Sequence, residues 1–308
     1  MEQTTAAPRL HGPKLTDFPK YPVITIVSLM AIGVTLAGWM KIDVSALFEA
    51  PQVRHGQLWR LLTSVLPHLD LLHLIFNLWW LWILGTTVER VLGHLNTVLL
   101  FLLFAIGPNA LQYAFSDAGA GLSGIGYGLF GLLWVLSHRD PRFAKTLDER
   151  TVSLFVGWFF LCIFLTLNHT WEVANFAHGG GALLGVLVGF AITNPKFRVA
   201  LSGGVVAIVV FGLWGATFGR AKLNLSSQAG LAEEYLGYTA LQNDKNQEAV
   251  QWLQEASLYR SNDPGVWYDL GIGYQRVGNL PAAKAAYQKA VQLKPTDPDY
   301  QNALRQMD

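Results

Sequence analysis

Ser123 lies in a glycine-lined turn at the start of an apolar run, in the order Gly121-Leu122-Ser123-Gly124. The first backbone N–H groups of a helix lack intrahelical partners, and the local field there favours negative charge. A serine at this position could attack a carbonyl carbon while free N–H groups stabilise the oxyanion. The alternative is packing, because Gly124 and Gly128 have the small-xxx-small spacing that lets membrane helices approach closely. Since short glycine motifs are weak evidence, this motif alone favours packing.

Other polar side chains fall inside apolar runs, where they are costly and are therefore functional candidates. His73 and Asn77 are four residues apart, so a helix would place them on one face. Tyr127 follows Ser123 by the same interval. His178 is followed by several glycines, which would allow another helix to approach it closely. The sequence thus supplies a hydroxyl nucleophile and imidazoles that could serve it as a base.

These candidates also have simpler interpretations. His178 alone could be a hydrogen-bonded buried histidine, and Asn77 alone could join two helices for about one kcal/mol. His68, His73 and His178 could form a metal site, but no metal-ligand spacing such as HExxH occurs. We therefore expect neither a metal nor a cofactor.

Charged residues near the ends of the apolar runs receive no catalytic role. His68 and Asp70, just before the second run, are interpreted as interfacial residues. Glu89 and Arg90 are interpreted as a topology anchor or a surface pair. Asp117 is the acid nearest to Ser123 in sequence, but no spacing supports it as a member of a catalytic triad.

The composition is that of a membrane protein. The chain has 308 residues, of which 52% are hydrophobic and 14% are charged, against about 25% charged in soluble domains. The net charge of +1 argues against a dominant role in nucleic-acid binding. The single cysteine, Cys162, excludes a disulfide framework within the chain.

Seven apolar stretches approach the roughly 20 residues that a helix needs to cross a bilayer. They are 22–40, 71–87, 96–115, 121–137, 152–168, 174–193 and 199–218. The long connection 41–70 is expected to be partly structured and to lie at the membrane interface, with Trp59 as an anchor. The predicted class is all-α, a polytopic transmembrane bundle followed by a small soluble helical domain.

The positive-inside rule predicts the orientation of these segments. The basic residues of one set of loops are Arg9, Lys14, Lys20, Arg90, Arg139, Arg142, Lys145, Arg150, Lys196 and Arg198. The opposite loops carry Lys41, Arg54 and Arg60 in the long connection and none in 116–120 or 169–172. We therefore expect a cytoplasmic N-terminus and, after an odd number of spans, an extracytoplasmic tail. A re-entrant or surface-lying seventh segment would reverse the side of the tail.

The tail contains an internal repeat. Counting from Pro264 in a 34-residue unit, the signature positions of the tetratricopeptide repeat are occupied by Trp267, Leu270, Gly271, Tyr274, Ala283, Tyr287, Ala290 and Pro295. A more degenerate unit precedes it, with Leu236, Gly237, Ala240, Ala249, Leu253 and Ala256 at equivalent positions. Such repeats form concave binding surfaces, which predicts a protein or peptide partner. The alternative is a stability or assembly element.

The polar residues occur together in an order that resembles the rhomboid family of intramembrane serine proteases. The resemblance covers residues 21–193 and rests on Leu58-Trp59-Arg60, His73 to Asn77, Gly121 to Gly124, Tyr127, and Ala177-His178 with its glycines. It implies a core of six spans. Neither the seventh span nor the repeat tail is covered by it.

The resemblance implies a role for each candidate. Ser123 would be the nucleophile and His178 its general base, as a dyad without a carboxylate. His73, Asn77 and the Ser123 backbone N–H would form the oxyanion hole. Tyr127 would pack on the base and restrain its ring, in place of the orienting acid of a triad.

The expected organisation is a cytoplasmic tail at 1–20, a rhomboid core at 21–195, an additional span at 196–222 and a tetratricopeptide-repeat domain at 223–308. The expected function is cleavage of transmembrane segments of other proteins in a bacterial inner or cell membrane. One alternative is a catalytically inactive rhomboid-like scaffold that binds client helices in the bilayer. Another is a transporter that uses His73 and His178 as a proton relay.

Overall fold

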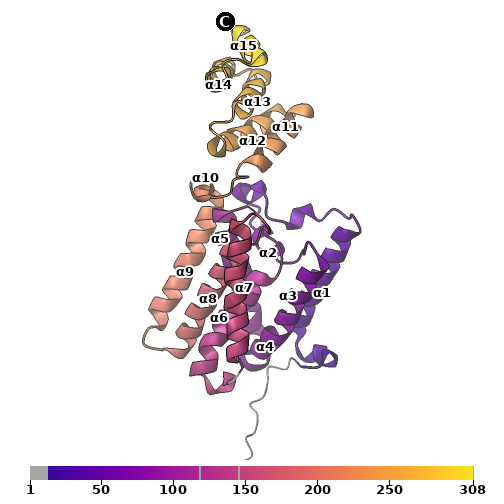
Figure 1. The fold of residues 1–308 in the computed structure, drawn as a ribbon, viewed down its shortest axis with the longest axis vertical. Coiled ribbons are helices and arrows are strands. Elements are labelled where there is room, and N and C mark those ends of the chain that lie inside the picture. Colours follow the sequence, from indigo (N-terminus) through magenta and orange to yellow (C-terminus); the bar gives the residue numbers. More distant parts are fainter. Residues whose placement is uncertain (1–12, 118, 145, 308) are drawn as a thin grey trace, which may run out of the picture. The chain divides into compact units, whose positions relative to one another are not determined.

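The computed structural model describes residues 13–117, 119–144 and 146–307 (Figure 1). This part of the chain is helical or irregular and contains no strand, which confirms the predicted all-α class. The chain divides into two compact units, Met1–Leu223 and Asn224–Asp308. The predictions for residues 1–12, including Arg9, and for Lys145 lie outside the described residues.

Helices build the first unit, and most of them are long and apolar (Figure 1). They are α1 Pro22–Trp39, α3 Leu71–Trp80, α4 Thr86–Leu92, α5 His94–Phe115, α6 Ser123–Arg139, α7 Glu149–Leu167, α8 Asn175–Thr193, α9 Arg198–Trp214 and α10 Arg220–Leu223. The π-helical turn η4, Leu81–Gly85, joins α3 to α4, and the similar turn η6, Gly215–Gly219, joins α9 to α10. Among the described residues, six helical segments are long and apolar enough to cross a membrane. The protein is thus a multi-pass membrane protein.

The remaining predicted span forms α6, which has 17 residues. At 1.5 Å per residue it is about 25 Å long, somewhat less than the roughly 30 Å hydrocarbon core. Most of its side chains are buried, and Leu129, Leu132 and Leu133 have no exposed surface. A helix enclosed by protein does not have to match the lipid thickness, which explains why this span is short.

Glycines bring α6 and α8 into backbone contact. A Cβ atom at Gly181 would overlap the carbonyl oxygen of Gly124, and one at Gly185 would overlap that of Gly128. The close packing that the glycine spacing predicts is therefore present between these two helices. Because His178 begins the same face of α8, this contact also fixes its distance from the start of α6.

The connection between α1 and α3 is partly structured. It contains the short helices η2 Ser45–Leu47, η3 Pro51–His55 and α2 Arg60–Thr63. The buried guanidinium of Arg60 donates hydrogen bonds to the Gln57 side chain at 2.7 Å and to the carbonyls of Ser45 and Phe48 at 3.0 Å. Trp59 remains 54% exposed. Arg60 therefore holds this loop together, while its neighbour faces outward.

Glu89 corrects the interpretation of a surface pair. Its side chain is buried and accepts hydrogen bonds from the backbone N–H groups of Val23 at 2.9 Å and Ile24 at 3.1 Å. It also lies 2.7 Å from Nδ1 of His94. Since the first N–H groups of a helix lack intrahelical acceptors, Glu89 caps α1 from another helix. Only Arg90 is exposed as predicted.

The second unit consists of helix hairpins, drawn in orange to yellow in Figure 1. Its helices are α11 Leu231–Gln242, α12 Asn246–Tyr259, α13 Pro264–Arg276, α14 Leu280–Leu293 and α15 Pro298–Arg305. Two further short helices, η1 Leu15–Lys20 and η5 Pro141–Phe143, belong to the first unit. A Cβ at Gly237 would overlap the Leu253 side chain, and one at Gly271 would overlap the Tyr287 ring. The small residues at the repeat positions therefore allow each helix pair to pack.

Candidate active site

Ser123 and His178 lie within hydrogen-bond distance. Ser123 Oγ is 2.8 Å from His178 Nε2, although the two residues are 55 positions apart in the chain. His178 is 4% exposed, and its Nδ1 has no hydrogen-bond partner among the described residues. Acceptance of the hydroxyl proton at Nε2 requires that the neutral ring carry its own proton on Nδ1. In the described part of the chain, the arrangement is thus a serine–histidine pair without a hydrogen-bonded carboxylate.

The backbone before Ser123 turns sharply. Gly121 has φ of 106°, a conformation that residues with a Cβ rarely adopt. Its N–H donates to the Ser64 carbonyl at 3.1 Å. The turn lets α6 begin at Ser123, so the hydroxyl is located at the end of the helix where backbone N–H groups are free.

Tyr127 restrains the imidazole. Its ring stacks on that of His178, with centroids 4.6 Å apart and an interplanar angle of 27°. Its hydroxyl donates to the Phe155 carbonyl in α7 at 3.1 Å. Because Tyr127 is itself buried and bonded, the ring of His178 is held from one side by packing.

His73 and Asn77 are positioned differently from each other. The His73 ring lies against the Gly121 turn, where an added Cβ would be 2.8 Å from its Cε1 and 3.1 Å from its Nε2. Asn77 is buried, and its amide donates to the His73 carbonyl within α3 at 3.0 Å. The Asp70 side chain accepts from the His73 backbone N–H at 2.8 Å and caps this helix. The structure therefore brings His73 to the turn, while the recorded bond of Asn77 is internal to its helix.

The interpretation of His68 as an interfacial residue is wrong. It is 3% exposed, its Nε2 accepts from the Leu122 backbone N–H at 3.3 Å, and its Nδ1 lies 3.0 Å from the Leu66 carbonyl. Burial, with a smaller effect of His73, lowers the pKa of His68 to about 4. The ring thus stays neutral near pH 7 and can accept the bond from the residue before Ser123.

Glu49 also holds the α5–α6 loop and was not singled out from the sequence. Its buried carboxyl group accepts from the Gly119 N–H at 3.1 Å and from the Ser64 hydroxyl at 3.3 Å. The Asn109 amide donates to the same hydroxyl at 2.8 Å. Burial raises the pKa of Glu49 to about 8. The connection between α1 and α3 therefore supports the turn that leads to Ser123.

Gln112 links the same loop to α8. Its amide oxygen accepts from the N–H groups of Phe176 at 3.1 Å and Ala177 at 3.3 Å, in the first turn of that helix. Its amide nitrogen donates to the Asp117 carbonyl at 3.2 Å. One side chain thus joins the segments that carry the two members of the pair. Sequence reasoning missed it because no motif marks its partners.

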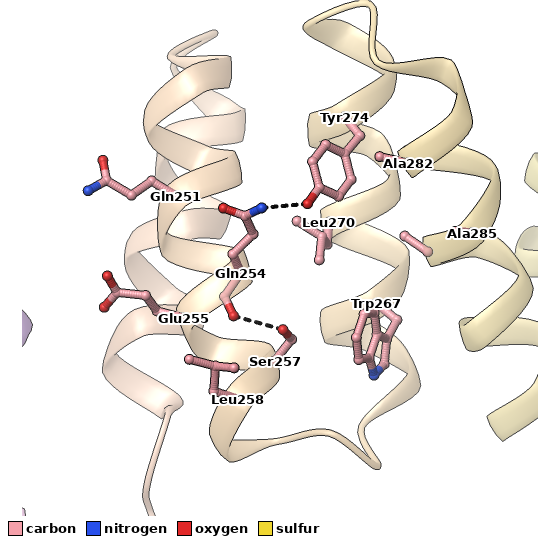
Figure 2. A pocket seen from close by; sticks show the side chains of 11 residues that line it. Gln251, Gln254, Glu255, Ser257, Leu258, Trp267, Leu270, Tyr274, Ala282 and Ala285 are labelled. Carbon is pink, nitrogen blue, oxygen red and sulfur yellow. Dashed lines mark hydrogen bonds between the residues drawn. The ribbon is translucent and has the colours of Figure 1, made fainter. Parts of the chain in front are cut away.

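The second unit has a hollow of about 510 Å³ between α12, α13 and α14. Trp267, Leu270 and Tyr274 line it from α13, and Gln254 faces them from α12 (Figure 2). The Gln254 amide donates to the Tyr274 hydroxyl. Aromatic faces beside amides suit a peptide, which offers both apolar and hydrogen-bonding groups.

A helical membrane bundle in which the partly buried Ser123 lies beside the buried His178 defines a multi-pass membrane protein that carries a candidate serine-nucleophile site. Residues 55–195 match the Rhomboid domain model, and residues 264–297 match the tetratricopeptide repeat model. The membrane-spanning part of the chain is therefore similar to the rhomboid family over residues 55–195, and its tail is similar to a tetratricopeptide repeat over residues 264–297.

Two curated relatives illustrate the extent of this similarity. The chain is 34% identical to the Rhomboid protease GlpG of Yersinia pseudotuberculosis serotype I (strain IP32953) over 143 residues, which are 46% of this chain and 51% of that protein. It is 33% identical to the Rhomboid protease GlpG of Enterobacter sp. (strain 638) over 177 residues, which are 55% and 62% of the two chains. The chain therefore spans about half to three fifths of these relatives.

Proposed function

We propose that this protein is an intramembrane serine endopeptidase that cleaves transmembrane segments of other membrane proteins. The observation that carries the proposal is the 2.8 Å approach of Ser123 Oγ to His178 Nε2 inside a membrane bundle. A nucleophile and a base within hydrogen-bond reach are the minimum for acyl transfer by a serine. The names of the two relatives, both rhomboid proteases, support the same reaction.

In the proposed reaction, Ser123 Oγ attacks the scissile carbonyl carbon while His178 Nε2 accepts the hydroxyl proton. Negative charge develops on the former carbonyl oxygen. The Ser123 N–H, the His73 ring and the Asn77 amide are the proposed donors to it. Each such donor contributes roughly 3–4 kcal/mol where water is scarce. His178 then transfers its proton to the leaving amine, the peptide C–N bond breaks, and an acyl-enzyme remains.

Hydrolysis of the acyl-enzyme repeats these steps with water as the nucleophile. His178 accepts a proton from the water, a new C–O bond forms, and the Ser123 oxygen leaves and takes that proton back. Stacking on Tyr127 takes the orienting role that a carboxylate has in a triad. The packing at 4.6 Å supports this assignment.

An active-site-directed fluorophosphonate distinguishes this function from an inactive scaffold. We expect the intact chain to be labelled on Ser123 and Ser123→Ala to remain unlabelled. His178→Ala should label much more slowly, because its serine has no base. Equal labelling of the intact chain and Ser123→Ala, or no labelling of the intact chain, would contradict the proposal.

We further propose that the repeat tail docks substrates or a partner protein. The aromatic and amide lining of the hollow supports a peptide ligand. The test is a truncation after Leu223, at the boundary between the two units, so that Arg220 and its bonds are retained. Labelling of Ser123 should be unchanged while the set of cleaved clients narrows. An unchanged set would argue for a purely structural tail.

The proposed orientation has the N-terminus in the cytoplasm and the tail outside. The positive residues of the loops near Arg139 and Arg198 support it. Sealed inverted and right-side-out vesicles treated with protease provide the test. The tail should be digested in right-side-out vesicles and protected in inverted ones.

A further inference from the structure

Arg220 is a buried charge in the extra span. Its side chain is 4% exposed, and it is the first residue of α10. It follows the segment 55–195 that matches the Rhomboid domain. A buried guanidinium is costly unless its donors are paired. The residues that pair with it therefore indicate what this end of the seventh span is built to hold.

The guanidinium of Arg220 binds the end of α5 and the loop that follows. Its Nη1 donates to the Ser116 carbonyl at 2.7 Å and to the Tyr113 carbonyl. Its Nη2 forms an ion pair with Asp117 at 3.0 Å. The guanidinium carbon also lies 3.8 Å from the centroid of the Tyr113 ring. The last carbonyls of a helix lack intrahelical donors and favour a cation, so this contact suits both partners.

The same loop leads directly to Ser123. The Gln112 side chain of α5 donates to its Asp117 carbonyl, and Glu49 in the connection between α1 and α3 accepts from its Gly119 N–H. Arg220 contacts the same loop from the seventh span. The seventh span also contacts the connection between α1 and α3, where Arg54 Nε donates a hydrogen bond to the Thr217 carbonyl at 3.0 Å.

We propose that Arg220 is a positioning residue for Ser123, which it serves by fixing the α5–α6 loop. The inference rests on the proposed protease function and extends it to the seventh span. That span then supports the nucleophile in addition to connecting the repeat tail. The argument is geometric: three acceptors on the segment before Ser123 converge on one buried side chain.

The test compares Arg220→Gln with the matched control Lys222→Gln in the full chain. Lys222 is an exposed cation in the same helix, so its substitution changes the charge equally without touching the loop. Measurements are kcat and KM for a reconstituted transmembrane substrate, the rate of fluorophosphonate labelling, and hydrogen exchange of the α5–α6 loop. All are expressed per folded molecule, as counted by thermal unfolding.

For Arg220→Gln we expect kcat and the labelling rate to fall by about tenfold or more, since small misplacements of reacting groups are costly. KM should change little, and the loop should exchange faster. Arg220→Lys should recover part of the labelling rate, because it keeps the charge but cannot form the planar fork. Lys222→Gln should match the unsubstituted chain in every measurement.

Unchanged kcat and labelling in folded Arg220→Gln would overturn the inference. If that variant does not fold, Asp117→Asn decides, because it removes the negative charge that pairs with Arg220 Nη2 and leaves the Arg220 side chain in place. We expect its labelling to slow by about two- to fivefold, and unchanged labelling would again overturn the inference. If Ser123→Ala still cleaves, the proposed function itself fails. If Ser123→Ala is inactive and Arg220→Gln fully active, only the role of Arg220 fails.

Discussion

Gly181 of α8 lies directly against the carbonyl oxygen of Gly124 in α6, so that the two backbones touch one turn beyond His178 and one residue beyond Ser123. This contact sets the separation of the two helices. It therefore links a packing feature to the 2.8 Å distance between Ser123 Oγ and His178 Nε2.

Gly181→Ala should damage both stability and activity. Its methyl group would overlap the Gly124 carbonyl, and backbone cannot yield as a side-chain end can. We expect a loss of about 1–3 kcal/mol in the free energy of unfolding and much slower fluorophosphonate labelling. The control is Gly179→Ala, whose Cβ would lie at an ordinary 3.5 Å from Phe159. Similar behaviour of the two variants would refute this role of the contact.

Tyr127→Phe and Tyr127→Ala separate the two contacts of this residue. The phenylalanine variant keeps the stacking on His178 and loses only the bond to the Phe155 carbonyl, so it should retain most of its kcat. The alanine variant frees the imidazole and should lose about tenfold or more in kcat. Steady-state kinetics of folded enzyme is the measurement. An alanine variant with normal kcat would show that the ring is held by something else.

Asn77→Ala should remain measurably active. It removes one proposed oxyanion donor and leaves the others, which predicts a kcat lower by about a hundredfold. The same variant should still be labelled by fluorophosphonate more readily than His178→Ala, because its nucleophile and base are intact. Activity equal to that of the unsubstituted chain would exclude Asn77 from the oxyanion hole.

The lowered pKa of His68 predicts that the free energy of unfolding decreases in acid. Burial lowers its pKa from 6.5 to about 4, so the unfolded chain binds a proton more readily between these values. The stabilisation is complete above pH 6.5 and is lost as the pH falls toward 4, with a total of about 3 kcal/mol. In His68→Gln, the free energy of unfolding should change less between pH 7 and pH 4. We would measure the difference in unfolding free energy between the two chains at pH 7 and pH 4; a constant difference would contradict the assignment.

The raised pKa of Glu49 predicts that the free energy of unfolding decreases as the pH rises. Its pKa is raised from 4.5 to about 8, so the folded chain holds this proton more tightly than the unfolded chain. The stabilisation is complete below pH 4.5 and declines as the pH rises through 8. Glu49→Gln keeps an acceptor for the Gly119 N–H and cannot ionise. Thermal unfolding from pH 5 to pH 9 should therefore show less decline for the variant; equal declines would reject the buried acid as the cause.

The candidate site was largely visible in the sequence because polar groups inside apolar segments are conspicuous. Ser123, Tyr127 and His178 stand out for that reason, and the glycines after His178 indicate which helices approach each other. The structure brings these three side chains together. The all-α class and the 264–297 repeat also follow from periodicity and spacing that are local in the chain.

The residues that hold the site in place could not be predicted from the sequence. Polar residues in loops are common, and the partners of these residues are distant in the chain. His68 was interpreted as interfacial and Glu89 as a surface residue, yet both are buried against backbone N–H groups of other segments. Arg220 follows the predicted span 199–218, and no motif in the sequence marks it. Which backbone group each one meets depends on tertiary packing, and no spacing in the sequence encodes it.

Released protein fragments provide the most direct test of the central claim. Cells that express the intact chain are compared with cells that express equal amounts of Ser123→Ala, and fragments whose new termini fall in or near transmembrane segments are quantified by mass spectrometry. The account predicts such fragments with the intact chain and their absence with Ser123→Ala. The same fragments at the same abundance with Ser123→Ala would contradict it.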